Sequence, residues 1–76
     1  MLPDELKKII QTNLPGAMVE IRDLTGAADH YEARVTSERF RGLSLIEQHQ
    51  LVQKPLLPLI NDGRLHALSI KTKLPN

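Results

Sequence analysis

Cysteine is absent from this chain of 76 residues. Its absence excludes disulfide bridges, which small secreted domains use to reinforce a small core, and any metal site in which this chain supplies a thiolate. Long apolar runs are also absent, and the N-terminal residues M-L-P-D-E-L-K-K differ from a signal peptide, which needs a basic start followed by an apolar stretch. We therefore expect a cytoplasmic protein with no membrane span.

An excess of charge of one sign is missing as well. Ten Lys and Arg face nine Asp and Glu, which leaves a formal net charge of +1 and no global basic field to attract phosphates. With one Tyr and one Phe, the chain has too few aromatic residues for the stacking platforms that hold single-stranded nucleic acids. Charge and aromatic content thus leave nucleic-acid binding unsupported without excluding it.

The common catalytic motifs are not found. The chain has no G-x-S-x-G, no P-loop, no G-x-G-x-x-G and no H-E-x-x-H. Carboxylate pairs such as Asp29 and Glu32 are most simply solvated surface charges. We therefore expect a protein without enzymatic activity.

What the chain does have is an ordinary globular composition, with 41% hydrophobic and 25% charged residues, which fits one small domain over residues 1–76. Apolar periodicity, a capping box at Ser44, and prolines and glycines divide it into elements. The expected elements are a helix at about 2–14, strands at about 17–23 and 30–37, helices at about 44–54 and 55–61, and a strand at about 65–72, followed by a tail from Lys73.

This α-β-β-α-α-β order predicts an α+β fold. The first two strands are close enough in sequence to form an antiparallel hairpin, whereas the third is reached through a helical crossover of about 20 residues, which allows parallel pairing. The sequence therefore predicts a three-stranded mixed sheet with helices packed on one face.

Histidine is the residue type that stands out, because imidazole is the commonest nitrogen ligand for iron, zinc and copper. His49 lies on the apolar stripe of the second helix, between Leu45 and Val52, which favours a packed core histidine. His30 opens the second strand out of phase with the apolar positions, which favours a surface histidine. For His66, near the start of the third strand, a structural role and a ligand role stay open. If His30 and His66 met, they would supply two of the roughly four ligands of a structural metal site, and a partner would have to complete it.

Two segments carry a resemblance to a known family. The run F-R-G-L-S-L-I-E-Q-H-Q-L-V at residues 40–52 and the run L-H-A-L-S-I-K-T at residues 65–72, together with His30-Tyr31-Glu32, resemble the BolA-like family over nearly the whole chain. The chain is similar to the branch with a histidine and no cysteine in its loop. It departs from the pattern at Gln48, where many members have arginine, and in its short loop between the first two strands.

The resemblance implies a fold related to the class II KH arrangement and a non-enzymatic adaptor. Such proteins pair with monothiol glutaredoxins and share a bridging 2Fe-2S cluster, with glutathione as a further ligand, in iron–sulfur trafficking or iron regulation. By position, His66 and His30 are the ligands that the resemblance implies for this chain. It also implies that the isolated chain carries no cofactor and is a monomer or weak homodimer.

Two alternatives stay open. The first is a nucleic-acid-binding transcriptional regulator, with DNA as a ligand, that uses the helix-turn-helix-like segment 44–60 and a basic surface. The residues of that surface would be Arg39, Arg41, Lys71 and Lys73. A KH domain, however, binds through a G-x-x-G loop that this chain lacks. The second alternative is a protein-interaction module in which the histidines are structural.

Overall fold

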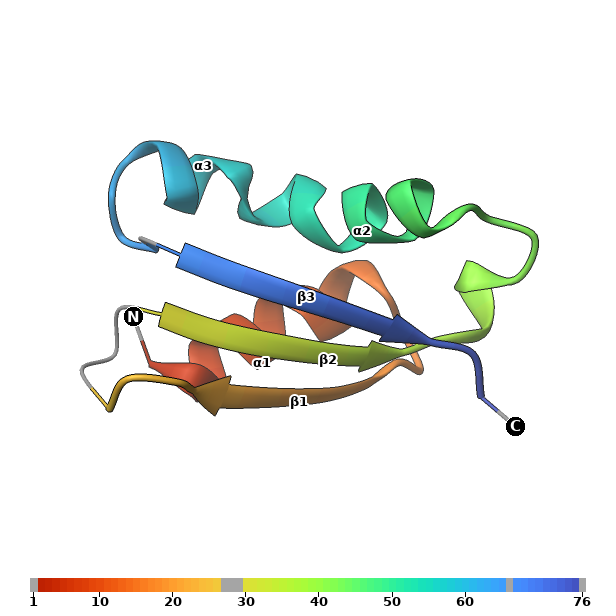
Figure 1. Ribbon diagram of the computed structural model, residues 1–76, viewed down its shortest axis with the longest axis horizontal. Coiled ribbons are helices and arrows are strands. Elements are labelled where there is room, and N and C mark those ends of the chain that lie inside the picture. The colour runs from red at the N-terminus through yellow and green to blue at the C-terminus, as the bar shows by residue number, and fades with distance from the viewer. Residues whose placement is uncertain (1, 27–29, 66, 76) are drawn as a thin grey trace.

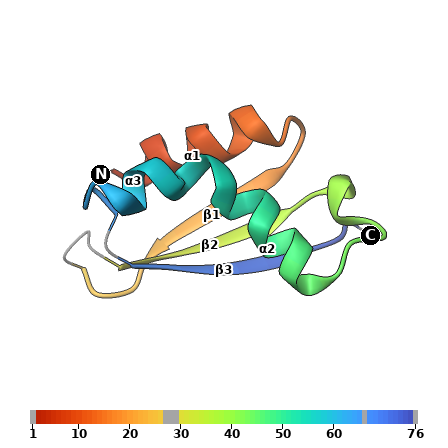
Figure 2. The same ribbon diagram turned by 90° about the horizontal axis from the view of Figure 1, so that it is seen from above.

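The computed structural model describes residues 2–26, 30–65 and 67–75. Three strands form one sheet in the order β1-β2-β3; β1 and β2 are antiparallel, and β2 and β3 are parallel. Figures 1 and 2 show that the helices all cover one face of this sheet and leave the other face open. The predicted α+β fold is confirmed. Its elements are α1 (Pro3–Asn13), β1 (Met18–Asp23), β2 (His30–Thr36), the 3-10 turn η1 (Glu38–Phe40), α2 (Leu45–Gln53), the 3-10 turn η2 (Lys54–Leu56), α3 (Leu57–Asn61) and β3 (Ala67–Lys73).

The core lies between the helices and the covered sheet face. Tyr31, Ala33 and Val35 alternate along the central strand β2 and are almost completely buried. The helices and the segments between elements pack other apolar side chains against them. The buried apolar residues outside β2 are Leu6, Ile10, Leu14, Ala17, Val19, Phe40, Val52, Leu56 and Leu65. The period-two pattern of β2 therefore fixes which side chains remain for the open face.

The capping box predicted at Ser44 starts α2. The Ser44 hydroxyl accepts a hydrogen bond from the Glu47 amide at 3.2 Å, and the Glu47 carboxylate accepts one from the Ser44 amide at 2.9 Å. The expected helix from Pro55 instead begins as the 3-10 turn η2, and α3 follows from Leu57. Pro55 has no amide hydrogen to continue α2, and Pro58 lies in the first turn of α3, where a missing amide costs little.

β3 is shifted toward the C-terminus relative to the sequence prediction. Lys73, expected in the tail, pairs with Thr36, and its carbonyl accepts a hydrogen bond from the Ser37 amide at 3.0 Å. At the other end the strand begins at Ala67, and His66 lies outside the described residues. Within the part of the chain that the structure describes, no helix is both long enough and apolar enough to cross a membrane.

Candidate functional site

The open face of the sheet is polar and consists of cross-strand rows. Because Tyr31, Ala33 and Val35 point into the core, the alternate residues of β2 point to the open face. The register extends each of them into a row with its neighbours on β1 and β3. The rows are His30 with Ala67, Glu32 with Arg22 and Ser69, Arg34 with Glu20 and Lys71, and Thr36 with Met18 and Lys73.

His30 occupies one end of this face. It is the first residue of β2, it is partly buried, and its Nε2 lies 3.5 Å from the Ser69 Oγ of β3. Its carbonyl accepts a hydrogen bond from the Leu24 amide at 2.9 Å, which anchors the start of β2 to the beginning of the hairpin loop. Its Cα partner across the parallel ladder is Ala67. The residue predicted to be the second ligand, His66, lies outside the described residues and directly precedes Ala67 in the chain.

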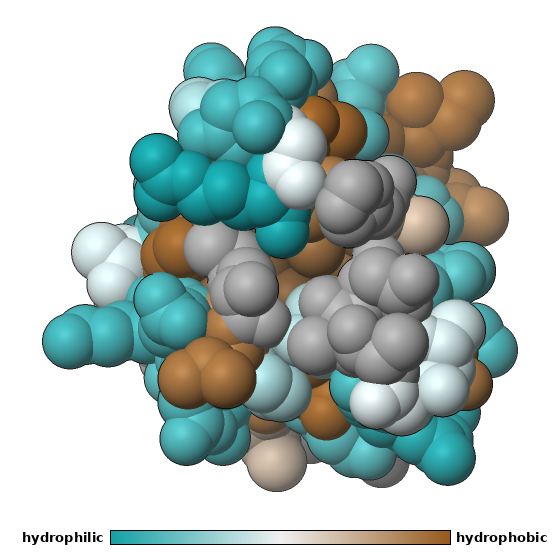
Figure 3. All heavy atoms as spheres, turned by 90° about the vertical axis from the view of Figure 1, so that its left-hand side faces the viewer, coloured by the Kyte–Doolittle hydropathy of each residue, from teal (hydrophilic) through white to brown (hydrophobic). Residues whose placement is uncertain are grey.

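Figure 3 views the end of the molecule at which β2 and β3 begin, where hydrophilic side chains border smaller hydrophobic areas. Among the residues that the structure describes, no three His, Cys, Asp or Glu side chains come close enough together to hold a metal ion. The described residues thus offer one imidazole at this end of the sheet. One imidazole does not form a complete metal site.

His49 was predicted to be a packed core histidine, and it is instead half-buried on α2. Leu45, predicted on the same apolar stripe, is 63% exposed, as is its neighbour Ile46 at 70%. Burial of α2 becomes complete only at Val52, near its C-terminal end. The first turn of α2 therefore extends beyond the core, and the apolar stripe is buried at one end only.

The burial of Glu32 differs from a second prediction. It was interpreted as a solvated surface charge paired with Asp29, but it is buried, at 7% exposure, in the middle of the open face, and Asp29 lies outside the described residues. Lys71 Nζ lies 3.4 Å from Glu32 Oε1, and Arg34 Nε lies 3.3 Å from Glu32 Oε2. Burial raises the pKa of the Glu32 carboxyl, but the hydrogen bond from Lys71 and the two positive charges outweigh that effect and leave the pKa below its ordinary value. The signal in the sequence was the central strand itself, with Arg34 two residues further along the same face.

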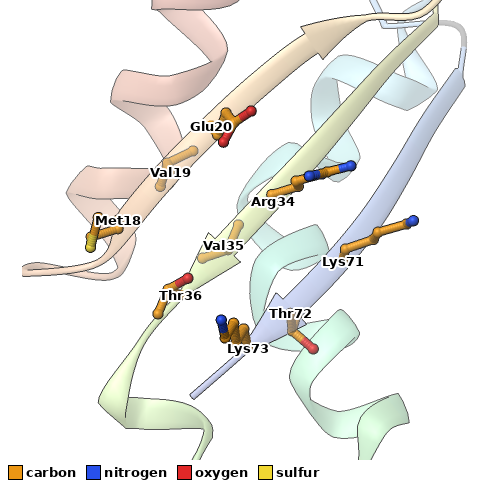
Figure 4. Close-up of a pocket in the computed structure, with 9 residues that line it drawn as sticks. All are labelled: Met18, Val19, Glu20, Arg34, Val35, Thr36, Lys71, Thr72 and Lys73. Carbon is orange, nitrogen blue, oxygen red and sulfur yellow. The ribbon is translucent and has the colours of Figure 1, made fainter. Parts of the chain in front are cut away.

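The four basic side chains of the predicted nucleic-acid surface differ in their ion pairs. Lys71 pairs with Glu32, and Arg41 pairs with Glu38, whose pKa is lowered by that hydrogen bond. Arg39 and Lys73 have no ion pair with another described residue. Figure 4 shows Lys71 and Lys73 beside a shallow groove on the open sheet face. Nucleic-acid binding by this surface stays a prediction.

Known proteins similar to this chain in sequence and structure identify its family. The family model described as BolA-like protein matches residues 6–76. This chain belongs to the BolA-like family. An uncharacterized protein of Rickettsia prowazekii is 44% identical over 69 residues, which cover 91% of this chain and 88% of the relative. The acid stress protein IbaG of Escherichia coli is 31% identical, over 95% of this chain and 82% of the relative. Among solved structures, BolA1 from Arabidopsis thaliana is similar with a TM-score of 0.82 and 29% identity, over 95% of this chain and 89% of that one.

The side chain of Gln48 connects α2 to the sheet. The Gln48 side-chain amide donates a hydrogen bond to the Leu43 carbonyl at 3.0 Å, and its oxygen accepts one from the Thr72 hydroxyl at 2.5 Å. Gln48 therefore joins the loop before α2, α2 itself and the end of β3. The sequence did not reveal these contacts of Gln48.

Proposed function

We propose that this BolA-like protein is a non-enzymatic adaptor that binds a monothiol glutaredoxin and shares a 2Fe-2S cluster with it as cargo. His66 and His30 are the ligands from this chain, and the glutaredoxin cysteine and glutathione supply the sulfur ligands. The role of such a complex is iron–sulfur cluster trafficking or iron regulation.

The observation that carries this proposal is the start of two parallel strands at one edge of the sheet. His30 is the first residue of β2, and it pairs with Ala67, the first residue of β3, which directly follows His66. In a parallel pair the beginnings of both strands lie at the same end of the sheet, although they are far apart in sequence. An antiparallel pair would separate the two strand starts by the length of the strands.

The half-exposed position of His30 also supports the proposal. A histidine enclosed in the core would be inaccessible to a ligand from another protein, whereas His30 is partly open to solvent at the end of the sheet. Because the chain has no cysteine and the described residues form no complete metal site, stable binding needs ligands from a partner. Two imidazoles and two thiolates form the mixed ligand set of a 2Fe-2S centre with histidine on one iron.

Ligation by histidine makes binding of the cluster by this chain depend on pH. Coordination requires the neutral imidazole, so protonation of His30 or His66 competes with binding. Histidine in place of thiolate gives such a cluster a higher reduction potential. Binding of the cluster by this chain is therefore expected to weaken on acidification.

The test is anaerobic reconstitution. The protein is mixed with a monothiol glutaredoxin, glutathione, iron and sulfide, and visible circular dichroism is compared with that of the glutaredoxin alone. We expect a new spectrum that disappears in His66→Ala and weakens in His30→Ala. His49→Ala is the matched control, because His49 lies on α2, in the helical layer rather than on the open sheet face.

Far-UV circular dichroism of each variant establishes that the apo fold is intact. The proposal is wrong if the double variant His30→Ala and His66→Ala keeps the wild-type cluster spectrum. It is also wrong if the folded wild-type protein produces no spectrum beyond that of glutaredoxin. In that case the next experiment is a DNA titration at several salt concentrations, because binding through phosphates weakens steeply as salt rises.

A further inference from the structure

The contact between His30 and Ser69 distinguishes the two nitrogens of the imidazole. Ser69 lies two residues beyond Ala67 on β3, and its side chain shares the open face with that of His30. Its Oγ approaches His30 Nε2 at 3.5 Å, the outer limit of a hydrogen bond. The contact joins β2 and β3 near the end where both strands begin.

We propose that Ser69 is a positioning residue for His30: its hydroxyl accepts a hydrogen bond from Nε2–H and leaves Nδ1 as the nitrogen that coordinates the metal. A coordinating imidazole carries its proton on the nitrogen that is not bound to the metal, and that N–H is commonly held by a neighbouring acceptor, which fixes the ring orientation. The Ser69 hydroxyl is such an acceptor, and it lies on the Nε2 side. The role in metal binding rests on the proposed function, whereas the hydrogen bond does not.

The surrounding residues support a fixed position for Ser69. Ser69 is partly buried and stands opposite Glu32, whose carboxylate is held by Arg34 and Lys71. The sheet ladder fixes the backbone of Ser69, so its hydroxyl can move only by rotation about χ1.

The first experiment needs no metal. Long-range ¹H–¹⁵N correlation spectra of the ¹⁵N-labelled chain, recorded at a pH at which imidazole is neutral, identify the tautomer of each histidine. We expect His30 to be almost entirely the Nε2–H tautomer in the wild type and in Ser69→Thr, which keeps the hydroxyl. In Ser69→Ala the Nδ1–H fraction should rise. An unchanged tautomer ratio in Ser69→Ala, or a predominant Nδ1–H form in the wild type, overturns the proposal.

The second experiment uses the glutaredoxin complex. Loss of a ligand-orienting neighbour typically weakens metal binding by about 10–100-fold. We therefore expect an iron chelator to remove the cluster at least about tenfold faster from the Ser69→Ala complex than from the wild type, with recovery in Ser69→Thr. If the cluster forms and Ser69→Ala releases it at the wild-type rate, the positioning role fails and the proposed function stands. If the tautomer shifts but no cluster forms in the wild type, the hydrogen bond stands and the proposed function fails.

Discussion

The Gln48 bridge between α2 and β3 gives a sharp prediction about what holds the sheet against the helices. Gln48→Ala removes both the hydrogen bond to the Leu43 carbonyl and the one from the Thr72 hydroxyl. Thr72→Val removes the second bond alone and keeps the shape of the side chain. The double variant closes a thermodynamic cycle that isolates the contact between Gln48 and Thr72.

The expected magnitudes follow from the number and burial of these bonds. A hydrogen bond between neutral groups contributes about 0.5–1.5 kcal/mol net. Both side chains are partly buried, so water replaces the lost partners only in part. We expect the free energy of unfolding to fall by about 1–2 kcal/mol in Gln48→Ala and by about 1 kcal/mol in Thr72→Val. The coupling energy should be about 1 kcal/mol, because the two single losses share one bond.

Urea denaturation followed by far-UV circular dichroism measures these free energies. Gln50→Ala is the matched control: Gln50 lies on the same helix, two residues further on, and is exposed, so its removal should change stability by less than about 0.5 kcal/mol. A coupling energy below about 0.3 kcal/mol would show that the bridge does not stabilise the domain in solution. The same result would remove the structural explanation given for Gln48.

Three further predictions concern the fold and its pH dependence. Ser44→Ala should lower the free energy of unfolding by about 1 kcal/mol in urea titrations, because it removes the acceptor of the α2 capping box. Leu56→Ala should cost about 2–5 kcal/mol because Leu56 is fully buried, whereas Leu57→Ala, at 42% exposure, should cost far less in the same assay. Glu32→Gln should flatten the dependence of stability on pH. Because the pKa of Glu32 is lowered in the folded state, its ion pair with Lys71 stabilises the fold at pH values above the ordinary carboxyl pKa of 4.5. This stabilisation is lost as the pH falls through the lower folded-state pKa. Urea midpoints measured across that pH range would detect the loss.

Local signals in the sequence were sufficient for the order of the helices and strands and for a three-stranded mixed sheet, but not for the strand order within it. The S-L-I-E pattern at Ser44 identified the start of α2, because a capping box satisfies backbone amides within one turn and needs no tertiary contact. Alternation at Tyr31, Ala33 and Val35 identified the buried face of β2. The length of the crossover allowed parallel pairing of β3. Each of these inferences depends on neighbours in sequence or on connection length.

Inferences that depended on distant neighbours were the ones that failed. No burial was predicted for Phe40, which lies in a short polar segment and is fully buried in η1. Glu32 has a polar side chain at an apparently exposed position, yet its strand is central, and neighbours on both sides enclose it. Leu45 shows the opposite effect, since helical periodicity cannot reveal that α2 projects past the edge of the core at its start. The contact of His30 with Ser69 likewise required the register between β2 and β3.

The parallel pairing of β2 and β3 is therefore the link between fold and proposed function. The side chain of His30 alone offers one ordinary imidazole at the end of a strand. The crossover through α2 and α3 returns the chain to the same edge of the sheet, so that β3 begins beside His30 rather than at the opposite end. The helices of that crossover pack against the sheet that contains β2 and β3, although none of their residues needs to touch a ligand. A shift of β3 by one residue would move Ser69 to the covered face and remove its contact with His30. Stability of the helical layer and integrity of the candidate site should thus be lost together.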